Sequence, residues 1–108
     1  MTKVTTLNNA DCYQDCHLLV NFQNKAVLLD GQTLILTRKE FDLLAFLVRR
    51  AGELVSRTVL LTVVWGYAAE MRTHTIDVHI RRLRQSLGCH GKDYIETIFG
   101  KGYRFHPC

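Results

Sequence analysis

The chain has 108 residues, a length that suits one compact domain, and its 47% hydrophobic content with a single proline excludes extensive disorder. Its net charge is +4, and no apolar run reaches the roughly eighteen residues that a membrane-spanning helix needs. The polar N-terminus lacks the apolar core of a signal peptide, so we expect a cytoplasmic protein with no membrane partner.

The positive charge is concentrated in the second part of the chain. Residues 1–36 carry two Lys and three Asp, a balance of −1, whereas residues 37–108 carry twelve Lys and Arg against seven Asp and Glu, a balance of +5. This distribution favours a polyanionic partner that binds in a salt-dependent way. An ordinary basic surface is the alternative interpretation.

Four cysteines raise the question of a metal or redox site: Cys12, Cys16, Cys89 and Cys108. Cys12 and Cys16, followed by His17, resemble half of a metal site, and Cys89 with His90 is a conceivable second half. The spacing departs from that of zinc fingers, so we predict no metal ion, no cofactor and reduced thiols. A redox pair formed by Cys12 and Cys16 is an alternative that no other sequence feature supports.

The first third of the chain predicts a small antiparallel sheet. Residues 1–16 are polar and poorly patterned, which indicates an N-terminal arm or an irregular first strand, and we place the compact domain at 17–108. Short apolar runs then predict strands near 18–22, 26–29 and 33–36. Asp30-Gly31, between the last two runs, favours a hairpin turn.

Two helices follow the sheet. The sequence T-R-K-E is a capping box in which Thr37 begins the first helix, and Gly52 follows its end. The broad apolar face of this helix is typical of a core position. Ser56 is the predicted N-cap of a second helix that ends at Gly66. The buried side of the second helix is formed by Leu60, Leu61, Val64 and Trp65.

The segment from Thr73 to Leu87 predicts an amphipathic helix with a cationic face. At about 100° per residue, one narrow apolar stripe contains Ile76, Ile80, Leu83 and Leu87. The opposite side contains His74, Thr75, Val78, Arg81, Arg82 and Gln85. This side lacks the Glu–Lys pairs of an ordinary solvated helix. Its guanidinium groups suit base edges and phosphates in a major groove, and Val78 suits a thymine methyl group.

The last segment predicts a β-hairpin. Tyr94–Phe99 and Tyr103–Phe105 alternate in the manner of strands, and Gly100-Lys101-Gly102 joins them as a turn. The order of a small sheet, three helices and a hairpin predicts an α+β fold. We expect a winged helix-turn-helix with an N-terminal antiparallel sheet, a three-helix core and a C-terminal β-hairpin wing.

The chain also resembles a known family through four motifs in order: L-T-R-K-E-F-D-L-L, V-S-R-T-V-L-L-T-V-V-W-G, T-I-D-V-H-I-R-R-L-R and I-E-T-I-F-G-K-G-Y-R-F. Over roughly residues 18–106 it is similar to the DNA-binding effector domain of OmpR/PhoB-type response regulators. The resemblance implies that the third helix enters the major groove of double-stranded DNA, and that the wing touches the adjacent minor groove or backbone. We therefore expect sequence-specific DNA binding for transcriptional regulation in a two-component system, by an effector domain that lacks a receiver domain.

The resemblance implies roles in DNA binding for eight residues of the third helix. Val78 and Arg82 are expected to contact bases, with Asp77 near the bases or orienting an arginine. The residues expected mainly to position the DNA backbone are Thr75, His79, Arg81 and Arg84. His74 stands where relatives often carry arginine, so a cationic contact there would depend on pH.

Outside that helix, the expected wing and backbone contacts are Trp65, Thr97, Phe99, Lys101 and Tyr103. Relatives often carry an arginine just before the glycine of the wing, where this chain has Phe99. Phe99 can pack on sugars, insert partway between bases, or fold back into the domain, while Lys101 supplies the charge.

Several of these residues have alternative interpretations within the domain. Trp65 suits the core, and Tyr103 suits a buried ring with an exposed hydroxyl. His79 can hydrogen-bond inside the protein, and the carboxylate of Asp77 is favoured by the helix dipole.

The resemblance further implies partners. Relatives bind direct repeats as head-to-tail pairs, so we expect a monomer in solution or a tandem pair on DNA. The residues expected to touch RNA polymerase are Tyr67, Glu70 and Arg72, although their loop suits a solvated connector equally well. The competing function is a winged-helix protein-interaction module without base readout. No carboxylate pair, nucleophile–base spacing or phosphate-binding glycine loop is present, so we predict that the chain is not an enzyme.

Overall fold

A computed structural model describes residues 12–66 and 74–108, and the chain divides into two compact units. Among the described residues, the first unit comprises 12–35 together with Cys108, and the second unit comprises the rest up to Pro107. The predicted polymerase-contacting residues Tyr67, Glu70 and Arg72 lie outside the described residues. None of the helices in the described part of the chain has the length and apolarity to cross a bilayer.

The first unit is a four-stranded antiparallel sheet in which each strand pairs with the next. Its strands are β1 (Cys12–Gln14), β2 (Leu18–Asn21), β3 (Ala26–Leu29) and β4 (Gln32–Leu34). Asp30 and Gly31 have φ angles of 51° and 83°, and these left-handed conformations make the tight turn that joins β3 to β4. The predicted hairpin is therefore confirmed, and β1 supplies the first strand of the sheet. The buried side chains are Tyr13, Leu18, Val20 and Val27.

A disulfide bond joins Cys16 to Cys108 within the first unit. Beside it, the backbone N–H of Cys108 donates to Oδ2 of Asp15 at 3.1 Å. The prediction of reduced thiols is therefore wrong for these two residues, while Cys12 and Cys89 are free cysteines. The two bonded residues are 92 positions apart, and spacing along the sequence carries no sign of such a distant pairing. Because Cys16 is bonded to Cys108, it is not a partner for Cys12 in a metal or redox pair.

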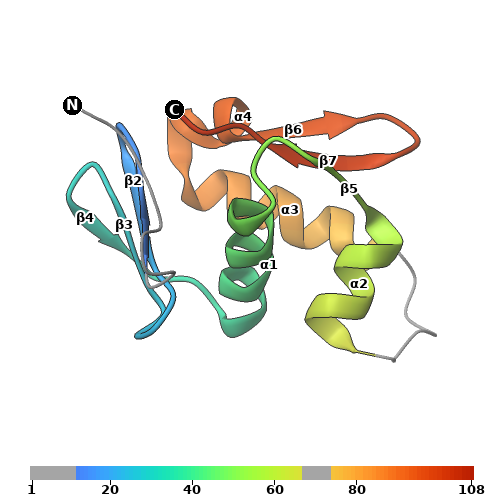
Figure 1. The fold of residues 1–108 in the computed structure, drawn as a ribbon, viewed down its shortest axis with the longest axis horizontal. Helices are drawn as coiled ribbons and strands as arrows, with labels where there is room; N and C mark the ends of the chain where they lie inside the picture. Colours follow the sequence, from blue (N-terminus) through green and yellow to red (C-terminus); the bar gives the residue numbers. More distant parts are fainter. Residues whose placement is uncertain (1–11, 67–73) are drawn as a thin grey trace. The chain divides into compact units, whose positions relative to one another are not determined.

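Three helices form the centre of the second unit (Figure 1): α1 (Arg38–Arg49), α2 (Arg57–Trp65) and α3 (His74–Ser86). The predicted caps are confirmed, because Thr37 Oγ1 accepts from the N–H of Glu40, and the carboxylate of Glu40 accepts from the N–H of Thr37. Ser56 caps α2 in the same way, accepting from the N–H of Val59 at 3.1 Å. The core of this unit is aliphatic and includes Leu43, Leu44, Leu47, Leu60, Ile76, Ile80 and Leu83.

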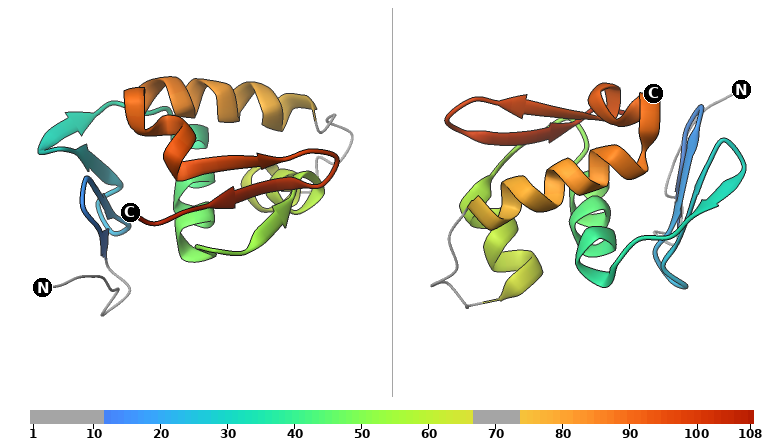
Figure 2. Two further views of the ribbon diagram at one scale, coloured as in Figure 1. Left: turned by 90° about the horizontal axis from the view of Figure 1, so that it is seen from above. Right: turned by 180° about the vertical axis from the view of Figure 1, so that it is seen from behind.

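A three-stranded sheet completes the second unit, with the strand order β5-β7-β6. Its strands are β5 (Leu54–Ser56), β6 (Ile95–Ile98) and β7 (Gly102–Phe105), and β6 and β7 form the predicted wing. Strand β5 was not predicted, because three residues between two helices are too few to show alternation. The short helices η1 (Gly88–His90) and α4 (Gly91–Tyr94) were also not predicted, and they connect α3 to the wing. Figure 2 shows α3 and the β6–β7 hairpin lying side by side in both views.

Gly102 allows β5 and β7 to approach closely. A Cβ atom at this position would lie 2.1 Å from the carbonyl oxygen of Val55, and the φ angle of Gly102 is 154°. Only glycine fits such a contact without a shift of the backbone. This close contact is at the end of β7 nearest the turn of the wing, where Gly102 pairs with Ser56 on one side and with Ile98 on the other.

Candidate nucleic-acid interface

The outer face of α3 is the first part of the candidate interface. Ile76, Ile80 and Leu83 have no exposed surface, so the predicted apolar stripe is confirmed. On the other side, Arg81 and Arg82 are exposed, and in the described part of the chain neither guanidinium has a hydrogen-bonding or ion-pairing partner. The other expected residues on this face are the exposed His74 and the half-buried Thr75 and Val78. The helix therefore presents uncompensated positive charge on a face anchored from behind by aliphatic side chains.

Arg84 has a different role in the structure, because its guanidinium binds inside the domain. Its Nη2 donates to the carbonyl oxygen of Ile95 at 2.8 Å and to Oγ1 of Thr97 at 2.6 Å, and its Nε donates to the same carbonyl at 3.1 Å. The guanidinium carbon also lies 5.7 Å from the centre of the Tyr103 ring. Arg84 and Thr97, both expected to contact the DNA backbone, are thus hydrogen-bonded to each other and tie α3 to β6.

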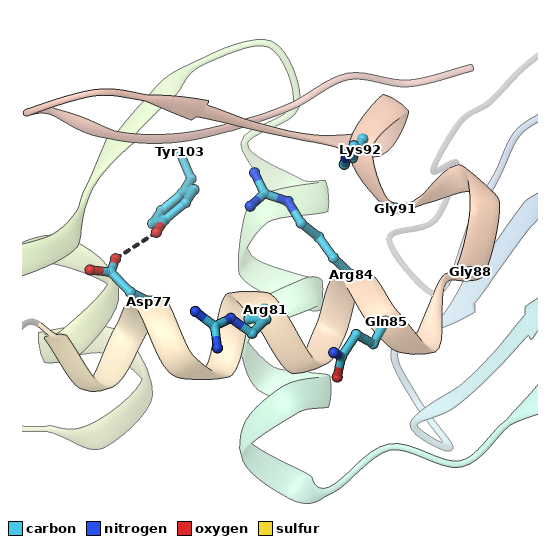
Figure 3. A pocket seen from close by; sticks show the side chains of 8 residues that line it. All are labelled: Asp77, Arg81, Arg84, Gln85, Gly88, Gly91, Lys92 and Tyr103. Carbon is cyan, nitrogen blue, oxygen red and sulfur yellow. Dashed lines mark hydrogen bonds between the residues drawn. The ribbon is translucent and has the colours of Figure 1, made fainter.

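Asp77 is held by two donors from other elements. Its Oδ1 accepts from Nε of Arg57 on α2 at 2.8 Å and from the hydroxyl of Tyr103 on β7 at 2.5 Å. The interpretation of Asp77 as a residue that orients an arginine fits this geometry, and the arginine is Arg57. The ring of Tyr103 is buried, with 4% of the residue exposed. Figure 3 shows the side chains of Asp77 and Tyr103 pointing toward one another across the space between α3 and the wing.

The same contacts shift the pKa of each member of this triad. Partial burial alone would raise the pKa of the Asp77 carboxyl, but the hydrogen bonds from Arg57 and Tyr103 outweigh burial and hold the pKa below its ordinary 3.8. Burial, reinforced by the hydrogen bond to Asp77, raises the pKa of the Tyr103 hydroxyl from 10.0 to about 12. The hydrogen bond to Asp77 also raises the pKa of the Arg57 guanidinium. Near neutral pH the triad therefore contains a carboxylate, a neutral phenol and a guanidinium.

Trp65 and His79 form a second cluster, where α2 meets α3. Their rings lie 4.9 Å apart in an edge-to-face arrangement, and Nζ of Lys39 lies 5.5 Å from the centre of the Trp65 ring. Nδ1 of His79 lies 3.0 Å from the carbonyl oxygen of Thr75, which can only accept, so this nitrogen carries the proton. Trp65 and His79 are both half-buried. Each therefore has a packing role within the domain and retains some surface for a partner.

A cleft of about 500 Å³ lies between α3, α4 and the wing. Figure 3 shows the residues that line it, which are Asp77, Arg81, Arg84, Gln85, Gly88, Gly91, Lys92 and Tyr103. Three basic side chains contribute to this lining, and the one carboxylate, Asp77, is already paired with Arg57. The cleft is therefore suited to an anion.

Three residues of this region were missed as site residues in the sequence. Gln85 lies on the predicted outer face of α3, and that position was a usable signal. Lys92 lies in α4, a helix of four residues that has no clear sequence pattern. Arg57 contacts Asp77 from 20 residues away, a pairing that periodicity within one helix cannot reveal.

The tip of the wing carries an exposed aromatic side chain. The N–H of Lys101 donates to the carbonyl oxygen of Ile98 at 2.9 Å, which leaves Phe99 and Gly100 at the corner of the turn. Phe99 is 88% exposed, so of the three alternatives for this residue, folding back into the domain is not what the structure shows. Lys101 is also exposed. The tip thus combines a phenyl ring with a nearby ammonium group.

Comparisons with known proteins agree on one kind of domain. The family model described as transcriptional regulatory protein, C terminal, matches residues 31–105. The uncharacterized transcriptional regulatory protein YclJ of Bacillus subtilis is 44% identical over 87 residues, which make up 80% of this chain and 38% of the relative. The chain therefore spans between about a third and a half of the length of the curated relatives it matches.

Two solved structures show the same fold. The response regulator DrrB of Thermotoga maritima, an OmpR/PhoB homolog, matches with a TM-score of 0.81 and 32% identity, over 89% of this chain and 44% of that chain. The DNA-binding domain of Klebsiella pneumoniae RstA, solved in complex with RstA box, matches with a TM-score of 0.79 and 32% identity. That match covers 90% of this chain and 98% of the RstA domain.

Proposed function

Since this chain belongs to the family of C-terminal domains of transcriptional regulatory proteins, in its OmpR/PhoB-type winged-helix branch, we propose that it regulates transcription by binding double-stranded DNA sequence-specifically. The observation that carries the proposal is the outer face of α3. Arg81 and Arg82 are exposed there, without an acidic partner in the parts of the chain described by the structure. A helix with this face fits the major groove, where guanidinium groups can pair with guanine.

Base recognition is assigned to the middle of α3. Arg82 is the candidate for a bidentate contact with guanine, and the half-buried Val78 is the candidate for contact with a thymine methyl group. His74 and Thr75 lie at the start of the same helix and complete its outer face. Each good base contact contributes about 1–3 kcal/mol of discrimination against the wrong base pair.

Backbone binding is assigned to the cleft beside α3. When a helix occupies the major groove and a hairpin the adjacent minor groove, the sugar–phosphate strand that separates these grooves must pass between them. The cleft between α3 and the wing is in that place, and Arg81, Gln85 and Lys92 line it. In this proposal they bind phosphates, whereas Asp77, Tyr103, Arg84 and Thr97 hold the wing against the helix.

The remaining parts of the proposal concern assembly and partners. We place the protein in the cytoplasm, as a monomer that pairs head-to-tail on direct repeats, with Tyr67, Glu70 and Arg72 as its contacts for RNA polymerase. The competing candidate function is that of a protein-interaction module without base readout. That function does not account for the uncompensated arginines of α3.

The test is selection of preferred sites from a random duplex pool, followed by affinity measurements on the selected and a scrambled duplex. The double variant Arg81→Glu with Arg82→Glu should lose binding to the selected duplex. The matched control makes the same change at Arg49 and Arg50, an exposed pair at the end of α1, and should retain most of the binding. Failure to enrich any sequence, or equal loss in both double variants, would contradict the proposal.

A further inference from the structure

We propose that Phe99 is a minor-groove wedge, which inserts partway between two stacked base pairs and makes the wing select a step that is easily unstacked. This inference rests on the proposed function and adds a second, different mode of sequence selection to that of α3. It begins from the exposure of the ring, which is 88% in the free domain. Removing the surface of a phenyl ring from water is favourable, so Phe99 has apolar surface available for a partner.

The tip that carries Phe99 is held firmly in the second unit. Ile98 pairs with Gly102 at the end of the β6–β7 ladder, and the turn is closed by the hydrogen bond from Lys101 to Ile98. Strand β7 lies between β5 and β6, so both of its edges are paired. A wedge requires this kind of support, because an aromatic ring on a mobile loop would lose conformational entropy on insertion.

Both strands of the wing are also tied to α3. Thr97 on β6 accepts a hydrogen bond from Arg84, and Tyr103 on β7 donates one to Asp77. When α3 is seated in a major groove, these contacts fix where the tip lies relative to the duplex. Figure 1 shows that the β6–β7 hairpin runs along α3, and that the turn at the tip of this hairpin lies beyond the ends of β6 and β7. Phe99 is therefore positioned for one defined place in the adjacent groove.

The composition of the tip favours DNA over a protein partner. Lys101 is exposed two residues from Phe99, and it supplies a charge for the phosphates that border the groove. Proteins that kink DNA from its minor groove commonly combine an inserted apolar side chain with basic side chains. A protein docking surface would need further apolar side chains, but Gly100 and Lys101 are the exposed neighbours in the turn.

The chemistry of the ring determines what the wing can select. A phenyl ring carries no charge and donates no hydrogen bond, so it does not respond to the negative potential of a narrow A·T-rich groove as a basic side chain does. Its insertion costs the stacking energy of one step. Pyrimidine–purine steps such as TA and CA are the least costly to open. The wing should therefore favour a flexible step at a fixed distance from the bases that α3 contacts.

The experiment combines Phe99→Ala with a change of the DNA step. The fluorescent base 2-aminopurine is placed in turn at each position beside the α3 site of the selected duplex. Its fluorescence should rise at one step, where the base is unstacked, when the wild type binds, and should not rise when Phe99→Ala binds. Phe99→Ala should weaken binding about 5- to 160-fold, the range for loss of one aromatic–base stack. Replacing the flexible step with a stiff AA step should weaken the wild type and leave the affinity of Phe99→Ala nearly unchanged. Phe99→Leu should retain part of the effect.

Leu54→Ala is the matched control, since Leu54 is an exposed apolar residue (43%) on β5 of the same sheet and pairs with Arg104. It should bind both duplexes like the wild type. The wedge is overturned if 2-aminopurine stays quenched in the wild-type complex and Phe99→Ala binds as tightly as the wild type. If Arg82→Ala still loses binding to the selected site in that case, the proposed function stands. It is equally overturned if Phe99→Ala alters sedimentation of the protein alone and leaves DNA binding intact. Loss of all sequence preference in the wild type would instead refute the proposed function.

Discussion

The hydroxyl of Tyr103 on β7 donates a hydrogen bond of 2.5 Å to Oδ1 of Asp77 on α3, and Arg57 on α2 donates to the same oxygen at 2.8 Å. Three elements therefore meet at one carboxylate oxygen. The wing and the cationic helix are held together by side-chain contacts as well as by the connecting chain. Movement of the wing relative to α3 would break these hydrogen bonds, so the two should engage DNA as one rigid surface.

The first prediction concerns the titration of Tyr103 in alkali. The folded protein holds its pKa at about 12, above the ordinary 10.0, so the unfolded chain loses this proton first as the pH rises. The contribution of Tyr103 to stability is thus fully present below pH 10 and is lost between pH 10 and about 12, by up to about 3 kcal/mol. Chemical unfolding across this pH range checks the loss, and Tyr103→Phe should reduce the slope of stability against pH.

The variant Asp77→Asn tests the contact itself. It should bring the pKa of Tyr103, followed by tyrosinate absorbance, closer to 10. An unchanged titration in Asp77→Asn would show that the contact has little influence.

The second prediction separates two arginines of α3. Arg82→Ala should weaken binding to the selected duplex by about 1–3 kcal/mol and relax the preferred sequence, with little change in the free energy of unfolding. Arg84→Ala should instead lower the free energy of unfolding by about 2 kcal/mol, because it removes charge-assisted hydrogen bonds to Ile95 and Thr97. Denaturant unfolding and competition binding distinguish the two effects. Arg84→Lys keeps the charge but not the fork geometry, so it should lose stability while the salt dependence of binding is kept.

The third prediction concerns the close approach at Gly102. Gly102→Ala places a methyl group against the carbonyl oxygen of Val55 and should destabilise the domain by about 2–4 kcal/mol. Gly100→Ala is the control, since a Cβ atom there meets nothing within 4 Å, and only the left-handed φ of 77° opposes it, at about 1–2 kcal/mol. Thermal unfolding of the two variants checks the order. Equal stability of both would mean that β5 moves away from β7 at little cost.

The fourth prediction concerns the disulfide between Cys16 and Cys108. Thiol labelling of the denatured, unreduced protein should find two reactive cysteines, Cys12 and Cys89, and labelling after reduction should find all four. By the chain-entropy model, closing a loop of this length stabilises the fold by roughly 4–5 kcal/mol. Cys16→Ser and reduced wild type should therefore unfold at similar denaturant concentrations, and reductant should not affect Cys16→Ser further. Cys12→Ser is the matched control and should unfold like the wild type. Four reactive thiols before reduction would contradict the bond.

The outer face of α3 and the winged-helix order could be predicted from the sequence because both depend on local patterns. Helical periodicity separates Ile76 and Ile80 from Arg81 and Arg82, and the capping box at Thr37 is complete within four residues. The hairpin turn at Asp30-Gly31 is equally local. Each of these patterns can be recognised from residues that are close to one another along the chain.

The pairings that shape the interface could not be predicted in the same way. Arg84 meets Thr97 from 13 residues away, and Asp77 meets Tyr103 from 26 residues away, so periodicity within one element carries no information about them. Residues expected as phosphate contacts, among them Arg84, Thr97 and Tyr103, are engaged inside the protein for this reason. Lys92 was missed because a helix of four residues has too few positions to show a face.

The bond between Cys16 and Cys108 also gives the molecule a closed covalent topology. Residues 16–108 form a ring, and α3 and both strands of the wing lie within it. A protease that makes a single nick inside this ring opens it without releasing a fragment. The nicked chain keeps its mass apart from one added water, and its two pieces separate only after reduction. After such a nick, α3 and the β6–β7 hairpin would remain on one covalently linked molecule. In a domain without the disulfide, the same nick would divide the chain into two separate pieces.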